Sequence, residues 1–137
     1  MSPDYEPIIA PWIWAFQDTR AKTKQLLANI RHDELDWAPP EGGNSIGSPL
    51  YHLAAIELSY LYEDILGTAW SAELASLLPY DIRDDDGILT RTLGEGRKDH
   101  LERLDASRAL FLPTLEVMSA QDFKRPRELG AYDVSPE

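Results

Sequence analysis

His52 and Glu57, five residues apart, carry side chains that could do chemistry. A neutral imidazole can bind a transition metal or transfer a proton, and a carboxylate can orient a ligand or act as an acid or base. Cysteine is absent, so a thiolate metal site and a disulfide framework are both excluded. Any metal site in this chain must therefore use imidazole or oxygen ligands.

Both candidates belong to residues 44–67, the longest apolar stretch with helical spacing. Ser45 can cap the first turn, and Gly67 suits the left-handed residue that often ends a helix. At about 100° per residue, one arc of this helix collects most of its aliphatic side chains, and Glu57 falls inside that arc while His52 lies on its flank. The side chains that we expect to be buried there are Leu50, Leu53, Ala54, Leu58, Leu61 and Ile65.

Glu57 needs a partner, because an unpaired carboxylate is costly to bury. We expect a structural ion pair with an arginine such as Arg20 or Arg108. The alternative is a role at a site, where Glu57 would orient a metal ligand or act as an acid or base. Glu57 and His52 are separated by about 140° on an ideal helix, which argues against both binding one metal ion directly.

Two further long helices are predicted around this one. The first should begin near residue 7 or 11, where a proline suits a first turn, and end near residue 30, because its apolar side chains recur at three- and four-residue steps, as an amphipathic bundle helix requires. The second should run from residue 95 or 97 to residue 119 with the same pattern, and Pro113 should kink it. His100 lies at the edge of its apolar stripe, where we expect a half-exposed side chain, with a role as a metal ligand as the alternative. His32 follows the first helix in a polar connector and should be exposed.

The remaining segments are shorter or polar. Ser71 can cap a short helix that ends before Pro79. Residues 84–87 are acidic and end in glycine, but they lack the alternating spacing of an EF-hand loop, so we interpret them as a solvated loop. Residues 135–137, Ser-Pro-Glu, have the composition of a helix N-terminus, which predicts a further helix that is missing from this sequence.

Several short motifs together resemble the DinB-like superfamily of helical-bundle metalloproteins. The motifs are Ser45-Ile46-Gly47, His52-Leu53-Ala54, Glu57, Leu66-Gly67, Trp37-Ala38-Pro39 and Arg125-Pro126. The resemblance extends over nearly the whole chain. It implies an all-α, DinB-like four-helix bundle as a single domain over residues 1–137, with three long helices present in this chain and the last helix missing.

The resemblance also implies metal chemistry at His52. In such proteins the matching histidine is one of three metal ligands, and the other two form an HxxxH pair on the final helix; no HxxxH occurs here. Three neutral nitrogens leave a zinc or nickel ion free to bind water or substrate. The expected function is therefore a metal-dependent small-molecule enzyme, similar to thiol-dependent S-transferases and isomerases or to a hydrolase. Its divalent metal, zinc or nickel, would need ligands from outside this chain.

Two alternatives do not require turnover. The first is a noncatalytic helical interaction module, a homodimer in which a second subunit covers the groove left by the absent helix. Burial of apolar surface, at about 25 cal/mol per Å², would favour such pairing. The second is a metal-binding protein without catalysis.

Composition narrows the choice of partners. Thirteen basic and twenty-four acidic residues give a formal charge of −11, which repels nucleic-acid phosphates. No run approaches the roughly 20 apolar residues of a membrane span, and the N-terminus lacks the basic start of a secretory signal. The sequence therefore predicts a cytoplasmic protein that binds neither nucleic acid nor membrane.

Overall fold

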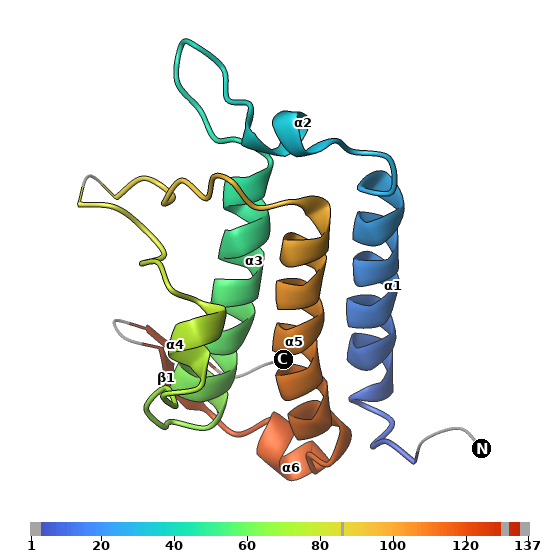
Figure 1. The fold of residues 1–137 in the computed structure, drawn as a ribbon. Coiled ribbons are helices and arrows are strands. Elements are labelled where there is room, and N and C mark those ends of the chain that lie inside the picture. The colour runs from blue at the N-terminus through green and yellow to red at the C-terminus, as the bar shows by residue number, and fades with distance from the viewer. Residues whose placement is uncertain (1–3, 86, 130–131, 135–137) are drawn as a thin grey trace.

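The computed structural model describes residues 4–85, 87–129 and 132–134 (Figure 1). It is an all-α helical bundle, as predicted, with one small antiparallel hairpin that the sequence pattern did not indicate. The elements in chain order are α1 (Ala10–Leu26), α2 (His32–Asp36), α3 (Gly47–Ser59), the π-helical turn η1 (Tyr60–Ile65), α4 (Leu74–Leu77), α5 (Arg97–Glu116), α6 (Ala120–Phe123), β1 (Arg127–Leu129) and β2 (Tyr132–Val134). The helix expected to begin at residues 135–137 lies outside the described residues.

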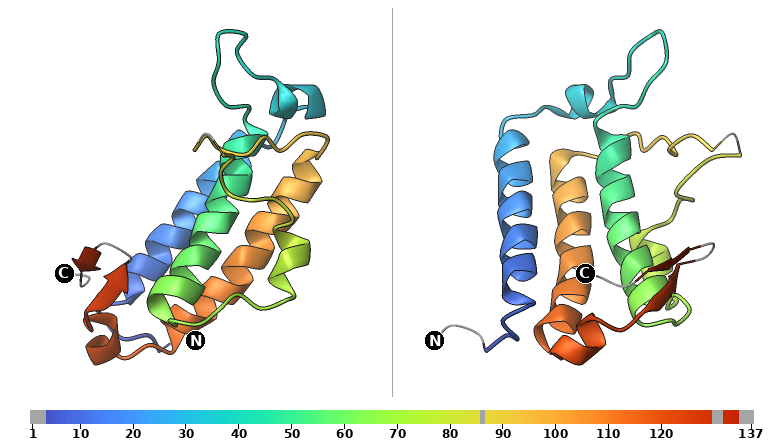
Figure 2. Two further views of the ribbon diagram at one scale, coloured as in Figure 1. Left: turned by 90° about the vertical axis from the view of Figure 1, so that its left-hand side faces the viewer. Right: turned by 180° about the vertical axis from the view of Figure 1, so that it is seen from behind.

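The three long helices lie side by side, with α5 between α1 and α3 (Figures 1 and 2). Both α1 and α3 pack against α5. Helices α3 and α5 run in the same direction, and α1 runs opposite to them (Figure 1). The chain must therefore return along the whole length of α3 before α5 can begin, and residues 66–96, which include α4, make this crossover.

Hydrogen bonds attach the crossover to the long helices. The Tyr51 hydroxyl on α3 donates to the Tyr80 carbonyl at 2.6 Å and accepts from the Tyr80 amide at 2.8 Å. The Arg103 Nε on α5 donates to the Leu77 carbonyl at 3.0 Å. These contacts place the crossover on one side of the α3–α5 pair.

Two clusters of buried apolar side chains form the core. The larger joins α1, α3, η1, α4 and α5, and its buried members are Ile9, Ile13, Leu58, Leu61, Leu74, Phe111, Leu115 and Met118. The smaller lies nearer the start of α3 and consists of Leu27, Leu35, Leu50, Ala54 and Leu104. The apolar arc predicted for the central helix is thus largely confirmed.

The start and end of α3 follow from small residues. Ser45 Oγ accepts from the Ser48 amide at 3.3 Å, which satisfies one of the free N–H groups at the helix start. After η1 the chain turns at Gly67, whose φ of +62° is the predicted left-handed conformation.

Leu53 was predicted to be buried, and that prediction is wrong: its exposed fraction is 49%. The buried side of α3 faces α5, where Ala54 and Leu58 have no exposed surface. Leu53 instead lies on the side of α3 that faces α1 across an open groove. Helical spacing placed Leu53 on the apolar face of the helix, but it could not predict whether another element covers that side chain.

His100 was predicted to be half-exposed, and that prediction is also wrong, since its exposed fraction is 1%. It lies in the first turns of α5, against the start of α3 and the crossover. A Cβ atom built on Gly47 would lie 3.0 Å from His100 Nε2 and 3.1 Å from the Thr92 carbonyl oxygen. Segments distant in sequence therefore cover this histidine, which its own helix would have left at an edge.

Candidate small-molecule site

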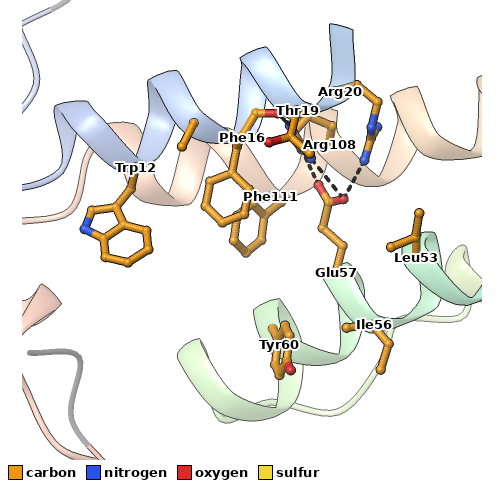
Figure 3. A pocket seen from close by; sticks show the side chains of 11 residues that line it. Trp12, Phe16, Thr19, Arg20, Leu53, Ile56, Glu57, Tyr60, Arg108 and Phe111 are labelled. Atoms are coloured by element: carbon orange, nitrogen blue, oxygen red, sulfur yellow. Dashed lines mark hydrogen bonds and ion pairs between the residues drawn. The ribbon is translucent and has the colours of Figure 1, made fainter. Parts of the chain in front are cut away.

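A groove with a volume of about 400 Å³ lies between α1 and α3, and α5 forms its floor (Figure 3). Seven of its eleven lining side chains are apolar or aromatic, and the other four are polar or charged. The lining residues are Trp12, Ala15, Phe16, Thr19, Arg20, Leu53, Ile56, Glu57, Tyr60, Arg108 and Phe111. The groove thus occupies the side of the bundle where α1 and α3 face each other.

Aromatic rings form much of its wall. Phe16 on α1 and Phe111 on α5 meet edge to face, with ring centroids 5.1 Å apart. Trp12 and Tyr60 are about half exposed, at 48% and 53%. Tyr60 is also the first residue of the π-helical turn, an irregularity that often accompanies functional sites. Apolar surface is therefore accessible from solvent on both sides of the groove.

Glu57 crosses the groove toward two arginines (Figure 3). Arg20 Nη2 on α1 donates to Glu57 Oε2 at 2.8 Å, and Arg108 Nε on α5 donates to Oε1 at 2.5 Å. The side chains of Glu57, Arg20 and Arg108 are only 9%, 11% and 14% exposed. The predicted ion pair is confirmed, and it involves both of the arginines that the sequence suggested.

The two arginines also bind backbone carbonyls. Arg20 Nη1 donates to the Leu104 carbonyl, and Arg108 Nη1 donates to the Phe16 carbonyl at 2.6 Å. The Arg108 guanidinium lies over the Phe16 ring, 5.2 Å from its centroid. This Arg20–Glu57–Arg108 triad therefore joins all three long helices through charged groups and fixes the direction of each guanidinium.

The triad carries a net charge of +1 when all three groups are ionised, from two guanidiniums and one carboxylate. Burial is the main cause that lowers the pKa of Arg20, and the positive charge of Arg108 lowers it further, whereas Glu57 opposes the shift. The excess positive charge is thus held at the bottom of an apolar groove in a chain whose formal charge is −11.

His52 lies on another side of α3 and does not line the groove. Its side chain is partly buried, and its Nδ1 is buried without a hydrogen-bond partner among the described residues. Burial lowers the pKa of His52, and the nearby charge of Arg83 lowers it further. A neutral imidazole with an unpartnered nitrogen is the form that binds a metal ion. The structure nevertheless keeps His52 and Glu57 apart, as their helical spacing predicted.

The described residues do not fit a metal centre. Within residues 4–85, 87–129 and 132–134, no group of three or more histidine or acidic side chains could hold a metal ion. His32 is exposed, with Nε2 3.3 Å from Asp36 Oδ2, and His100 is buried at the start of α5. His52 alone is too weak a ligand set to retain a transition metal.

A second polar cluster surrounds His100, away from the groove. Neither imidazole nitrogen has a hydrogen-bond partner in the described structure, and His100 Nδ1 lies 4.0 Å from Glu95 Oε2. Thr92 is fully buried beside it, and its amide donates to Ser48 Oγ at 3.4 Å. Burial is the main cause that lowers the pKa of His100, and the charge of Glu95 partly opposes it.

His100 should make the stability of the fold depend on pH. Since its pKa is lowered in the folded state, the unfolded chain binds this proton more readily. The stabilisation is complete above the ordinary pKa of 6.5 and is lost as the pH falls from 6.5 toward the folded value. The slope contributed by one proton is at most about 1.4 kcal/mol per pH unit.

Urea unfolding of the wild type and of His100→Asn at several pH values measures this effect. The free energy of unfolding of the wild type should fall more steeply below pH 6.5 than that of the variant. The comparison uses slopes, so a general loss of stability in the variant does not affect it. Equal slopes in the two proteins would contradict the assignment.

Comparison with known proteins supplies one match. A family model described as the DinB superfamily matches residues 15–136 of the chain. No curated protein and no solved structure matches it significantly. In the described residues, no helix is both long enough and apolar enough to span a membrane.

Proposed function

This chain belongs to the DinB superfamily, and from that premise we propose that it binds a small organic molecule in the groove between α1 and α3. The observation that carries the proposal is the groove itself, with its volume of about 400 Å³ and its apolar lining around three converging charged side chains. Concave sites of this size, mostly apolar with a few fixed polar groups, are typical of small-molecule binding. Membership of the superfamily alone does not specify a substrate.

A neutral fluorescent probe tests the groove as a binding site. N-phenyl-1-naphthylamine, an uncharged aromatic amine, should bind with increased emission. Leu53→Trp should reduce its affinity at least fivefold, because a larger side chain would fill the groove. Leu26→Trp is the matched control, since Leu26 is 85% exposed and does not line the groove. Equal affinities in both variants, or no binding to the wild type, would refute the proposal.

The proposal includes metal-dependent transferase, isomerase or hydrolase chemistry only where further residues complete a site at His52. Such ligands would come from another subunit or from a segment beyond the described residues. A zinc or nickel ion held there would supply Lewis-acid chemistry. Among the described residues, His52 belongs to no group of three side chains that could hold a metal ion, so such chemistry depends on ligands from elsewhere.

His52→Ala should separate metal binding from folding. The side chain is only partly buried and its nitrogens have no hydrogen bond in the described structure, so we expect a change of less than about 1 kcal/mol in the free energy of unfolding. In protein purified with stoichiometric metal, the variant should lose that metal. Elemental analysis with native mass spectrometry measures both metal content and assembly; unchanged metal content would exclude His52 as a ligand.

A second candidate function is a noncatalytic homodimer in which another copy covers the groove. The half-exposed Trp12, Leu53 and Tyr60 favour it, because grouped exposed apolar side chains often mark interfaces. Sedimentation of the wild type and of Leu53→Glu distinguishes this candidate. A concentration-dependent dimer that the variant abolishes would support the interaction module, and a wild-type monomer at all concentrations would exclude it.

A further inference from the structure

We propose that the groove selects an organic anion, with an apolar or aromatic body and one acidic group directed at Arg20 and Arg108. The inference rests on the proposed function, because it names the class of molecule that the groove would take. The acid would approach the two guanidiniums where Glu57 already holds them. The body would lie along the aromatic wall formed by Trp12, Phe16 and Tyr60.

The charge balance of the triad favours an anion over a cation or a neutral ligand. One carboxylate faces two guanidiniums, so one positive charge has no counterion within the triad. The carboxylate of Asp105 interacts electrostatically with Arg20, but it is not a full counterion for the triad. It already forms an ion pair with Lys24, whose Nζ lies 2.7 Å away. A ligand with one negative charge would therefore neutralise the net charge of +1 on the triad.

The guanidiniums of Arg20 and Arg108 have more N–H donors than hydrogen bonds in the described structure. Two guanidiniums carry ten N–H groups, and their hydrogen bonds within the described structure number five: two from Arg20 and three from Arg108. The bonds to Glu57 and to the carbonyls of Leu104 and Phe16 hold the guanidinium planes in place. Prepositioned donors bind a carboxylate or sulfonate with little ordering of the protein, which favours affinity.

Burial strengthens this selection. The two arginine side chains are no more than 14% exposed, and apolar rings border them. Charged hydrogen bonds in such surroundings are less weakened by water than those on an open surface. A neutral molecule of the same shape would gain contact with the rings but not with the excess charge.

Two probes that share one aromatic body test the inference. 8-Anilinonaphthalene-1-sulfonate is the sulfonated form of the neutral N-phenyl-1-naphthylamine. Arg108→Met leaves a one-to-one pair of Arg20 and Glu57, so the triad loses its net charge. We expect this variant to bind the sulfonate about tenfold more weakly, a clearly larger loss of affinity than for the neutral amine. Arg108→Lys should retain part of the sulfonate affinity.

Arg91→Met is the control for overall charge, because Arg91 is exposed and lies outside the groove. It should change neither affinity by more than twofold. Sulfonate affinity that is equal in wild type and Arg108→Met would overturn the inference, even if the neutral amine binds. Failure of the neutral amine to bind in the groove would instead overturn the proposed function.

Competition on the unmodified protein keeps the inference testable if the arginine variants do not fold. 1-Naphthoate should displace the sulfonate, and 1-naphthamide, which has nearly the same shape without the charge, should require at least a tenfold higher concentration. Equal displacement by the acid and the amide would overturn the selection for an anion.

Discussion

Glu57→Gln should destabilise the fold by about 3 kcal/mol. Removing one partner of a buried ion pair typically costs about 3–5 kcal/mol, because it leaves an uncompensated charge. Here the change would leave two guanidiniums on the same side of the groove without the carboxylate that separates them. The slight exposure of the triad, 9–14%, supports the lower end of that range. Urea unfolding followed by circular dichroism measures the loss.

Glu73→Gln is the control for this substitution, because Glu73 is exposed and its side chain has no ion pair in the described structure. It should change the free energy of unfolding by no more than about 0.5 kcal/mol. A loss of similar size in both variants would show that the triad does not carry the stability assigned to it.

A triple replacement sharpens the same argument. Arg20→Leu, Glu57→Met and Arg108→Leu together remove all three charges and keep apolar volume in the groove. Buried ion pairs replaced by well-packed apolar residues are often neutral or stabilising. The triple variant should therefore be more stable than Glu57→Gln alone, while binding the naphthalene sulfonate no better than the Arg108→Met variant does.

Gly47→Ala should destabilise the fold by about 2 kcal/mol, within the usual range for adding a methyl group to a packed site. Its Cβ would approach His100 Nε2 at 3.0 Å and the Thr92 carbonyl oxygen at 3.1 Å. The imidazole is buried and the carbonyl belongs to the backbone, so neither can move away freely. Thermal and urea unfolding measure the loss, which should exceed any gain in helix propensity from alanine.

Gly96→Ala is the matched control at the start of α5. A Cβ there would lie 3.7 Å from His32 Nδ1 and 3.8 Å from Asp99 Oδ2, which is ordinary van der Waals contact. Its φ of −82° and ψ of 174° suit any residue. We expect a loss below about 1 kcal/mol, since alanine is a poorer N-cap than glycine. Equal losses at both glycines would contradict the steric argument.

The sequence predicted features that depend on neighbouring residues or on the pairing of opposite charges. The left-handed Gly67 followed from its place at the end of an apolar run, and the Glu57 pair followed from the cost of burying a carboxylate. The sequence failed where burial depends on distant segments. Leu50 and Leu53 are chemically identical, yet one contacts α5 and the other faces the groove. His100 is buried by the crossover, which no helical periodicity describes.

The candidate site shows the same division. Arg20, Glu57 and Arg108 were recognisable as one charged set, but their place on the floor of an aromatic groove was not. Trp12 and Phe16 have the spacing of core residues, and only the arrangement of α1 against α5 exposes part of that surface. Whether a bundle surface is interior or open depends on the number of helices around it, which residue spacing does not specify.

The parallel arrangement of α3 and α5 also bears on how the chain folds. Their pairing must close the connection of residues 66–96, whereas antiparallel helices can pair through a short turn. Such nonlocal contacts slow folding relative to simple helical hairpins. Since the groove needs side chains from α1, α3 and α5 together, we expect its binding capacity to appear only once this nonlocal pairing has formed. A ligand of the groove would therefore slow unfolding more than it would speed folding.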